Sequence, residues 1–197
     1  MNTRRSWLLL ILSITAWAAG KDKRFEVQPA DSYPTKQTSE GLIIAAVPYT
    51  TAEQMKSAFG KLNLNAYGVL PVLLVMRNGS GQTLNLRQME ITYVTPGRYR
   101  VDATPASDVQ YIEGPRRPNL GGSPIPNPIP RKRKNKLASF EIEGYAMNAK
   151  MLPPGESAHG FVYFQTPHLK GSHIYIRGIT EARTGKELLY FEIPLDQ

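Results

Sequence analysis

Short apolar runs separated by turn residues dominate the pattern of hydrophobic and polar positions along the chain. Runs of this length are typical of β-strands, because one or both faces of a strand then point into a core. The clearest run, GVLPVLLVMR, ends at Asn78 and Gly79, which favour a chain reversal. The pattern predicts strands at 24–28, 41–47, 68–77, 82–86, 89–94, 99–103, 159–165, 172–180 and 186–194.

A single segment carries a clear helix signal. Thr50 followed by Glu53 fits a capping box at a helix N-terminus, and Gly60 fits the C-terminal end. The resulting helix, 51–59, would present an apolar face to a sheet. Residues 139–145 fit a strand or a helix.

Many strands and one helix predict an all-β fold rather than an α/β fold, which needs a helix between successive strands. Closely spaced turns favour an antiparallel sandwich or barrel, and the 16 glycines and 16 prolines agree with many turns. The length of 197 residues predicts one domain. Hydrophobic residues make up 41% of the chain, which is enough for a packed core.

The order of the turn and strand motifs is similar to that of a known type of domain. The motifs are a strand that ends at Asn78 and Gly79, and a later Pro-Gly-Glu turn before a Gly-aromatic strand, at Pro154, Gly155, Glu156, Gly160, Phe161 and Phe164. Over 42–195 the chain resembles the immunoglobulin-like accessory domains of bacterial cell-envelope proteins. The resemblance implies an antiparallel immunoglobulin-like β-sandwich that binds or spaces other components and is not catalytic. The chain lacks the lipidated cysteine of the lipoprotein members.

The N-terminus has the layout of a secretory signal. Arg4 and Arg5 precede an apolar run at 7–19, and Ala16 and Ala18 supply the small residues that signal peptidase reads. We therefore expect a signal peptide at 1–18, a single mature domain at 19–197 and a periplasmic or secreted location. The alternatives are an uncleaved anchor, for which the run is short, and a buried N-terminal helix.

The export route and the compartment follow from a few further features. Residues 3–9 also resemble a twin-arginine signal, but the short basic start and the strongly apolar run favour the general secretory (Sec) route. The chain contains no cysteine, which excludes disulfides and thiolate chemistry. An exported chain without disulfides points to a bacterium. No other segment is apolar enough to cross a membrane, so no span remains after signal cleavage.

The positive charge is concentrated in one proline-rich insertion at 114–136. The formal net charge is +8, and the insertion carries seven basic residues and, from 115 on, no acidic one: Arg116, Arg117, Arg131, Lys132, Arg133, Lys134 and Lys136. Its prolines exclude a helix or a central strand, so we predict a long solvated loop. These seven residues are candidates for binding an anionic polymer or an anionic lipid. The alternative is a loop that charge merely keeps soluble.

The residue types that carry catalysis or bind metal form no recognisable constellation. His159, His168 and His173 lack the close spacing of a zinc site, and Glu141 and Glu143 are two carboxylates without a cleft assigned to them. No nucleophile elbow or phosphate-binding glycine motif occurs. We therefore predict no cofactor, no metal and no enzymatic activity.

Tyrosines interleaved with apolar residues in the last strands are the remaining candidates. Tyr163, Tyr175 and Tyr190 alternate with core residues, so they are expected on an outer sheet face that binds a sugar or a peptide. The alternative is that they pack beneath the helix or the other sheet. The sequence thus predicts a noncatalytic envelope module that contacts a protein or peptide. Anion binding through the loop is the second hypothesis, and steep weakening by salt would distinguish it.

Overall fold

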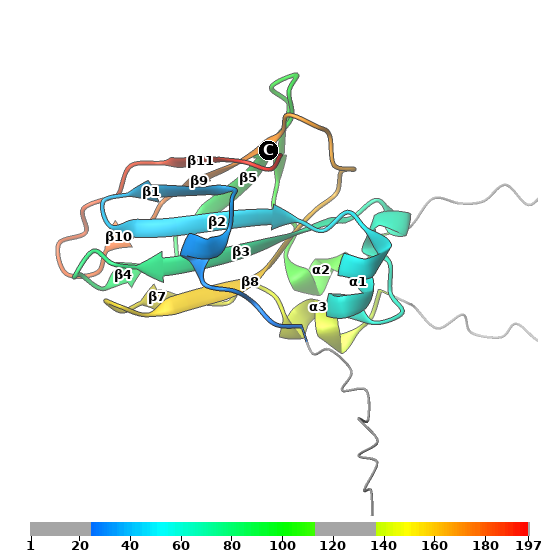
Figure 1. Cartoon of the computed structure of the whole chain (residues 1–197), viewed down its shortest axis with the longest axis horizontal. Helices are drawn as coiled ribbons and strands as arrows, with labels where there is room; N and C mark the ends of the chain where they lie inside the picture. Colours follow the sequence, from blue (N-terminus) through cyan, green and yellow to red (C-terminus); the bar gives the residue numbers. More distant parts are fainter. Residues whose placement is uncertain (1–24, 113–136, 197) are drawn as a thin grey trace, which may run out of the picture.

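The computed structural model describes residues 25–112 and 137–196, and most of their strands lie in two four-stranded sheets (Figure 1). The first sheet has the order β1-β2-β3-β8 and consists of β1 (Lys36–Ser39), β2 (Leu42–Pro48), β3 (Leu70–Asn78) and β8 (Ser157–Phe164). The second has the order β11-β9-β5-β6 and consists of β5 (Glu90–Val94), β6 (Arg100–Asp102), β9 (His173–Arg177) and β11 (Phe191–Pro194). A small third sheet joins β10 (Thr180–Glu181), β4 (Leu84–Asn85) and β7 (Met151–Leu152).

The first sheet is the middle layer of the molecule. Successive residues of β3 are buried on opposite faces: Val72, Leu74 and Met76 on one face, and Leu73 and Val75 on the other. The first face packs on the second sheet, in a core that includes Tyr93. The other face packs on the helices. Burial on both sides explains the apolar run of β2 and the apolar residues 70–76 of β3.

Short helices in the described part of the chain cover the outer face of the middle sheet or connect its strands. They are η1 (Ala30–Ser32), α1 (Ala52–Phe59), η2 (Leu64–Tyr67), α2 (Ala106–Val109) and α3 (Phe140–Gly144). In α1, Met55 and Phe59 are buried against the sheet, as predicted. The capping box lies one residue later than predicted. The Thr51 hydroxyl accepts from the Gln54 N–H, and the Gln54 side chain accepts from the Thr51 N–H.

The sequence predicted the all-β class and the antiparallel pairing correctly, since every pairing within the three sheets is antiparallel. The prediction of only one helix is wrong. Residues 139–145 contain α3, and α2 is too short for a periodic signal. Residues 25–28 form no strand, because Phe25 and Val27 pack on the helical core without a neighbouring strand to pair with.

Several predicted features fall on residues 1–24 and 113–136, outside the described part of the chain. They are the signal peptide at 1–18 and the basic insertion at 114–136. The described residues nearest to the insertion are Ile112 and Leu137. Within 25–112 and 137–196, no helix is long and apolar enough to span a membrane.

Candidate functional site

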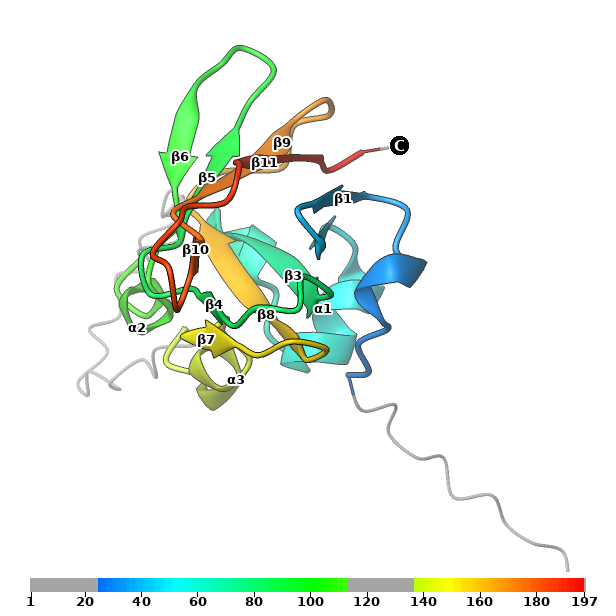
Figure 2. The same ribbon diagram turned by 90° about the vertical axis from the view of Figure 1, so that its left-hand side faces the viewer.

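A groove with a volume of about 880 Å³ lies along the edge of β8, at the side of the middle sheet away from β3. We call it the β8 groove. One wall is the segment 103–107, which leads from β6 into α2, and the other is the segment 146–150, which leads from α3 to β7. Figure 2 shows α2, α3 and β7 around β8. The groove is therefore built from segments that are distant in the sequence.

Backbone hydrogen bonds hold both walls against β8. The Thr104 N–H donates to the Tyr163 carbonyl at 2.7 Å, and the Met147 N–H donates to the Phe161 carbonyl at 3.0 Å. The Phe161 N–H donates in turn to the Tyr145 carbonyl at 2.7 Å. The edge of β8 is thus paired at two points, and the groove opens between them.

The floor of the groove is apolar and belongs to the core between the two large sheets. Its partly buried side chains come from the segment 89–91 and from both walls, and they pack directly on that core: Met89, Ile91, Ala103, Met147 and Ala149. Val162 of β8 contributes a buried surface. An apolar floor with a few polar groups around it is the usual composition of a ligand-binding cleft.

Charges at the rim give the groove two different ends. Arg87 and Lys150 line one end, where the Leu86 N–H donates to the Lys150 carbonyl at 2.9 Å. Glu143 of α3 lines the helical end, beside Ser107 of α2. A ligand with a negative group toward Arg87 and Lys150 would match this polarity.

The expected surface position of Tyr163 is wrong. Its ring is 1% exposed and packs in the core beneath the helices, and its hydroxyl donates to the Ile142 carbonyl at 2.7 Å. Burial raises the pKa of the Tyr163 hydroxyl. The reason is that helices cover the face of β8 on which Tyr163 lies, and alternation along the strand does not reveal this cover.

Replacing Tyr163 by phenylalanine is expected to lower the free energy of unfolding by about 1–2 kcal/mol, because the Ile142 carbonyl loses its donor in a buried position. Urea titration measures the change. Tyr99→Phe is the control, since Tyr99 is 76% exposed and its substitution should change little. An equal effect of both substitutions would contradict the structural role of the hydroxyl.

Tyr175 and Tyr190 lie on the outer face of the second sheet. Their ring centroids are 5.4 Å apart, and the Arg100 guanidinium lies 5.2 Å from the centroid of the Tyr175 ring. Tyr190 is 52% exposed, whereas Tyr175 is partly covered by its neighbours. The structure therefore brings two of the three tyrosines together on one face and separates Tyr163 from them.

The other predicted binding residues lie outside the described part of the chain. They are the seven basic residues of the insertion: Arg116, Arg117, Arg131, Lys132, Arg133, Lys134 and Lys136. Anion binding through them stays a prediction.

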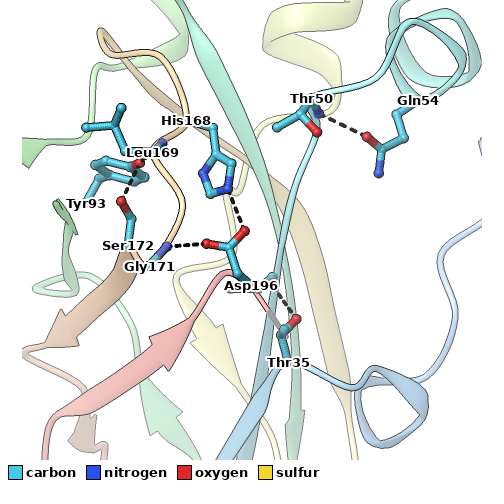
Figure 3. A network of polar contacts seen from close by, with 10 residues as sticks. Thr35, Thr50, Gln54, Tyr93, His168, Leu169, Gly171, Ser172 and Asp196 are labelled. Atoms are coloured by element: carbon cyan, nitrogen blue, oxygen red, sulfur yellow. Dashed lines mark hydrogen bonds and ion pairs between the residues drawn. The ribbon is translucent and has the colours of Figure 1, made fainter. Parts of the chain in front are cut away.

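The three histidines lie in different surroundings. His159 is in β8 of the first sheet and His173 in β9 of the second, so the two do not share a sheet. His168, in the loop between these strands, contacts the Asp196 carboxylate, with 2.9 Å between its Nε2 and Oδ1 (Figure 3). Among the described residues, no group of three or more side chains is arranged to hold a metal ion.

A polar network around His168 fastens the loop between β8 and β9. The second carboxylate oxygen of Asp196 accepts from the Gly171 N–H at 2.6 Å. Beside it, the Tyr93 hydroxyl donates to the Ser172 hydroxyl and accepts from the Leu169 N–H, both at 2.8 Å (Figure 3). Ser172 is 1% exposed, so its hydroxyl is a structural group.

The hydrogen bond from His168 lowers the pKa of Asp196 in the folded protein. A lowered pKa stabilises the fold at a pH above the ordinary aspartate pKa of about 3.9, and this contribution is lost as the pH falls through the folded value. Asp196→Asn is therefore expected to reduce stability by about 1 kcal/mol at neutral pH, with the difference from the native protein shrinking in acid. Urea titrations over a pH series test this, with Asp108→Asn at an exposed position of α2 as control. A difference that stays constant into acid would contradict the prediction.

Sequence reasoning missed the β8 groove. Its apolar residues fit the pattern of strands such as 89–94, and nothing local shows that two walls leave Met89 and Ile91 partly uncovered. One available signal was Gly160. An added Cβ at this position would lie 2.5 Å from the Met147 backbone, so the glycine marks a close approach to β8.

Comparisons with known proteins assign the chain to no family. No family model and no curated protein matches it. Among solved structures, a functionally unknown protein from Listeria monocytogenes is 12% identical, with a TM-score of 0.36, over 82% of this chain and 81% of that chain. A Bacillus subtilis protein described as a candidate lipoprotein is 14% identical, with a TM-score of 0.40, over 81% of this chain. The match covers 38% of the Bacillus protein, so this chain spans less than half of its length.

Proposed function

We propose that the protein is an exported, noncatalytic binding module of the bacterial cell envelope, which holds an extended peptide segment of a partner protein in the β8 groove. The observation that carries the proposal is the groove itself. It has a volume of about 880 Å³ and an apolar floor between two backbone walls. In this proposal the two antiparallel sheets are an immunoglobulin-like scaffold, and the N-terminal signal supplies the export.

An extended peptide suits the shape and chemistry of the groove. Alternate side chains of such a peptide point to one side, where Met89, Ile91 and Met147 offer an apolar surface. The polar side chains of the rim, such as Thr104 and Asn148, can bond to the backbone of the peptide. The floor thus supports binding of apolar side chains in a single row.

The polarity of the rim supports a direction for the peptide. Arg87 and Lys150 favour an acidic side chain or a terminal carboxylate at their end, and Glu143 disfavours one at the helical end. A peptide with apolar residues and one acidic end is therefore the expected ligand.

The noncatalytic part of the proposal is supported by the bonding of the described polar groups. Ser172 is buried and bonded to Tyr93, and His168 is bonded to Asp196. These groups hold a loop in place, and a nucleophile or general base needs access to a substrate instead.

The test is a selection of short random peptides on the purified protein, followed by affinity measurements with the selected synthetic peptides. We expect an enriched pattern of alternating apolar residues with an acidic residue at one end. Ala149→Arg, which places a long side chain across the floor, should abolish binding of these peptides. Leu189→Arg is the matched control, since Leu189 is exposed and does not line the groove.

The melting temperatures of both variants must stay close to that of the native protein for the comparison to count. Peptides that bind Ala149→Arg as well as the native protein would overturn the proposal, as would the lack of any enriched pattern. Turnover of a substrate by the purified protein would refute its noncatalytic part.

A further inference from the structure

The strand β6 is a sheet edge that the described part of the chain leaves uncovered. The two large sheets have four edge strands: β1, β8, β6 and β11. Thr104 and the segment 145–147 bond to β8, while the Glu192 N–H of β11 donates to the Gln37 side chain of β1 at 2.6 Å. No residue in 25–112 or 137–196 bonds to the outer edge of β6, which ends its sheet in Figure 2.

The hydrogen-bonding pattern of β5 and β6 shows which backbone groups face outward. The Ala103 N–H donates to the Ile91 carbonyl, and the Thr95 N–H donates to the Tyr99 carbonyl. Since bonded pairs alternate in an antiparallel ladder, Val101 bonds to Tyr93. The N–H and C=O groups of Arg100 and Asp102 therefore point away from β5, toward a further strand.

The side chains along this edge are complementary to themselves. Arg100 and Asp102 lie on the outer face of the sheet, where Arg100 contacts the Tyr175 ring and Asp102 accepts from the Thr92 hydroxyl at 3.2 Å. An antiparallel copy centred on Val101 would place each Arg100 opposite an Asp102. Opposite charges across two strands attract, whereas the same charge repeated along an edge prevents pairing.

We propose that two copies of this chain pair through β6 about a twofold axis at Val101, joining their two four-stranded sheets into one continuous sheet. Arg100 of each copy exchanges backbone hydrogen bonds with Asp102 of the other. On the inner face, the two Val101 side chains, which already pack partly on the core, meet each other. A twofold interface of this kind uses the same residues on both partners.

The proposal is independent of the β8 groove and is tested by the oligomeric state. Sedimentation velocity of the purified native protein should show a dimer that dissociates on dilution. Arg100→Asp turns both attractive pairs into pairs of carboxylates, and Asp102→Arg turns them into pairs of guanidiniums. Each variant should weaken the dimer by roughly ten- to a hundredfold.

Mixing the two variants gives the sharpest result. The β6 edge of the Arg100→Asp variant carries two acidic side chains, and that of the Asp102→Arg variant carries two basic ones. A one-to-one mixture should therefore form a dimer with one copy of each variant. Arg183→Asp makes the same charge change at an exposed residue of the turn after β10, and this control should remain dimeric.

Circular dichroism and melting curves show whether each variant is folded. A native protein that is monomeric at high micromolar concentration would overturn the proposal and leave the edge to a strand from another protein. Single variants that dimerise like the native protein, or a mixture that stays monomeric, would also overturn it.

Discussion

Replacing Asn78 by alanine is expected to lower the free energy of unfolding by about 3 kcal/mol. The side chain is completely buried at the end of β3. Its amide donates to the Gln82 carbonyl at 2.7 Å and to the Leu152 carbonyl at 2.8 Å, and its carbonyl oxygen accepts from the Ser80 N–H at 3.0 Å. Alanine would remove all three hydrogen bonds, of which the one to Leu152 is buried and the other two are partly buried.

Asn85→Ala is the control for this substitution. The Asn85 side chain accepts one hydrogen bond, from the Arg87 N–H, and is only partly buried. Its loss should lower stability by about 1 kcal/mol or less. Urea titration of both variants measures the two values, and a loss at Asn78 no larger than that at Asn85 would contradict the bonding role of Asn78.

Replacing Gly160 by alanine is expected to destabilise the protein by about 3 kcal/mol and to displace one wall of the β8 groove. A Cβ at this position would lie 2.5 Å from the Met147 N and Cα atoms and 2.7 Å from the Ala146 carbonyl carbon. Backbone atoms cannot move aside as a flexible side chain can, so the segment 146–150 must shift away from β8.

Gly185→Ala separates this clash from backbone strain. Gly185 has a φ of +73°, but an added Cβ would have no atom within 4 Å. This variant should lose about 1 kcal/mol and keep peptide binding, whereas Gly160→Ala should lose both stability and binding. Urea titration and affinity for a selected peptide measure the two effects, and retained binding by Gly160→Ala would contradict the placement of the groove.

The strands with strong local patterns are those that the sequence predicted well. The runs 41–47 and 68–77 became β2 and β3, because long stretches of consecutive apolar residues suit a strand with both faces buried. Segments with a weaker pattern were predicted less well. In the alternating segment 24–28, the described residues 25–28 form no strand, and β1 was not predicted because its residues, Lys-Gln-Thr-Ser, are polar.

The candidate site was harder to predict than the fold. Tyr175 and Tyr190 lie together on the outer face of the second sheet, where Tyr175 alternates with the buried Ile174 and Ile176 of β9. The same alternation misplaced Tyr163, because its strand has apolar residues on both faces and helices cover the second one. The β8 groove left no local signal beyond the close approach at Gly160.

The all-β class, the helix at 51–59 and the turn at Asn78 follow from local sequence, because each depends on residues within a few positions of one another. Three-dimensional packing sets which strands become neighbours, which face of β8 the helices cover and where an edge stays open in the described part of the chain. These features depend on contacts between distant segments, such as Thr104 with Tyr163, and the periodicity of a strand does not specify its partner.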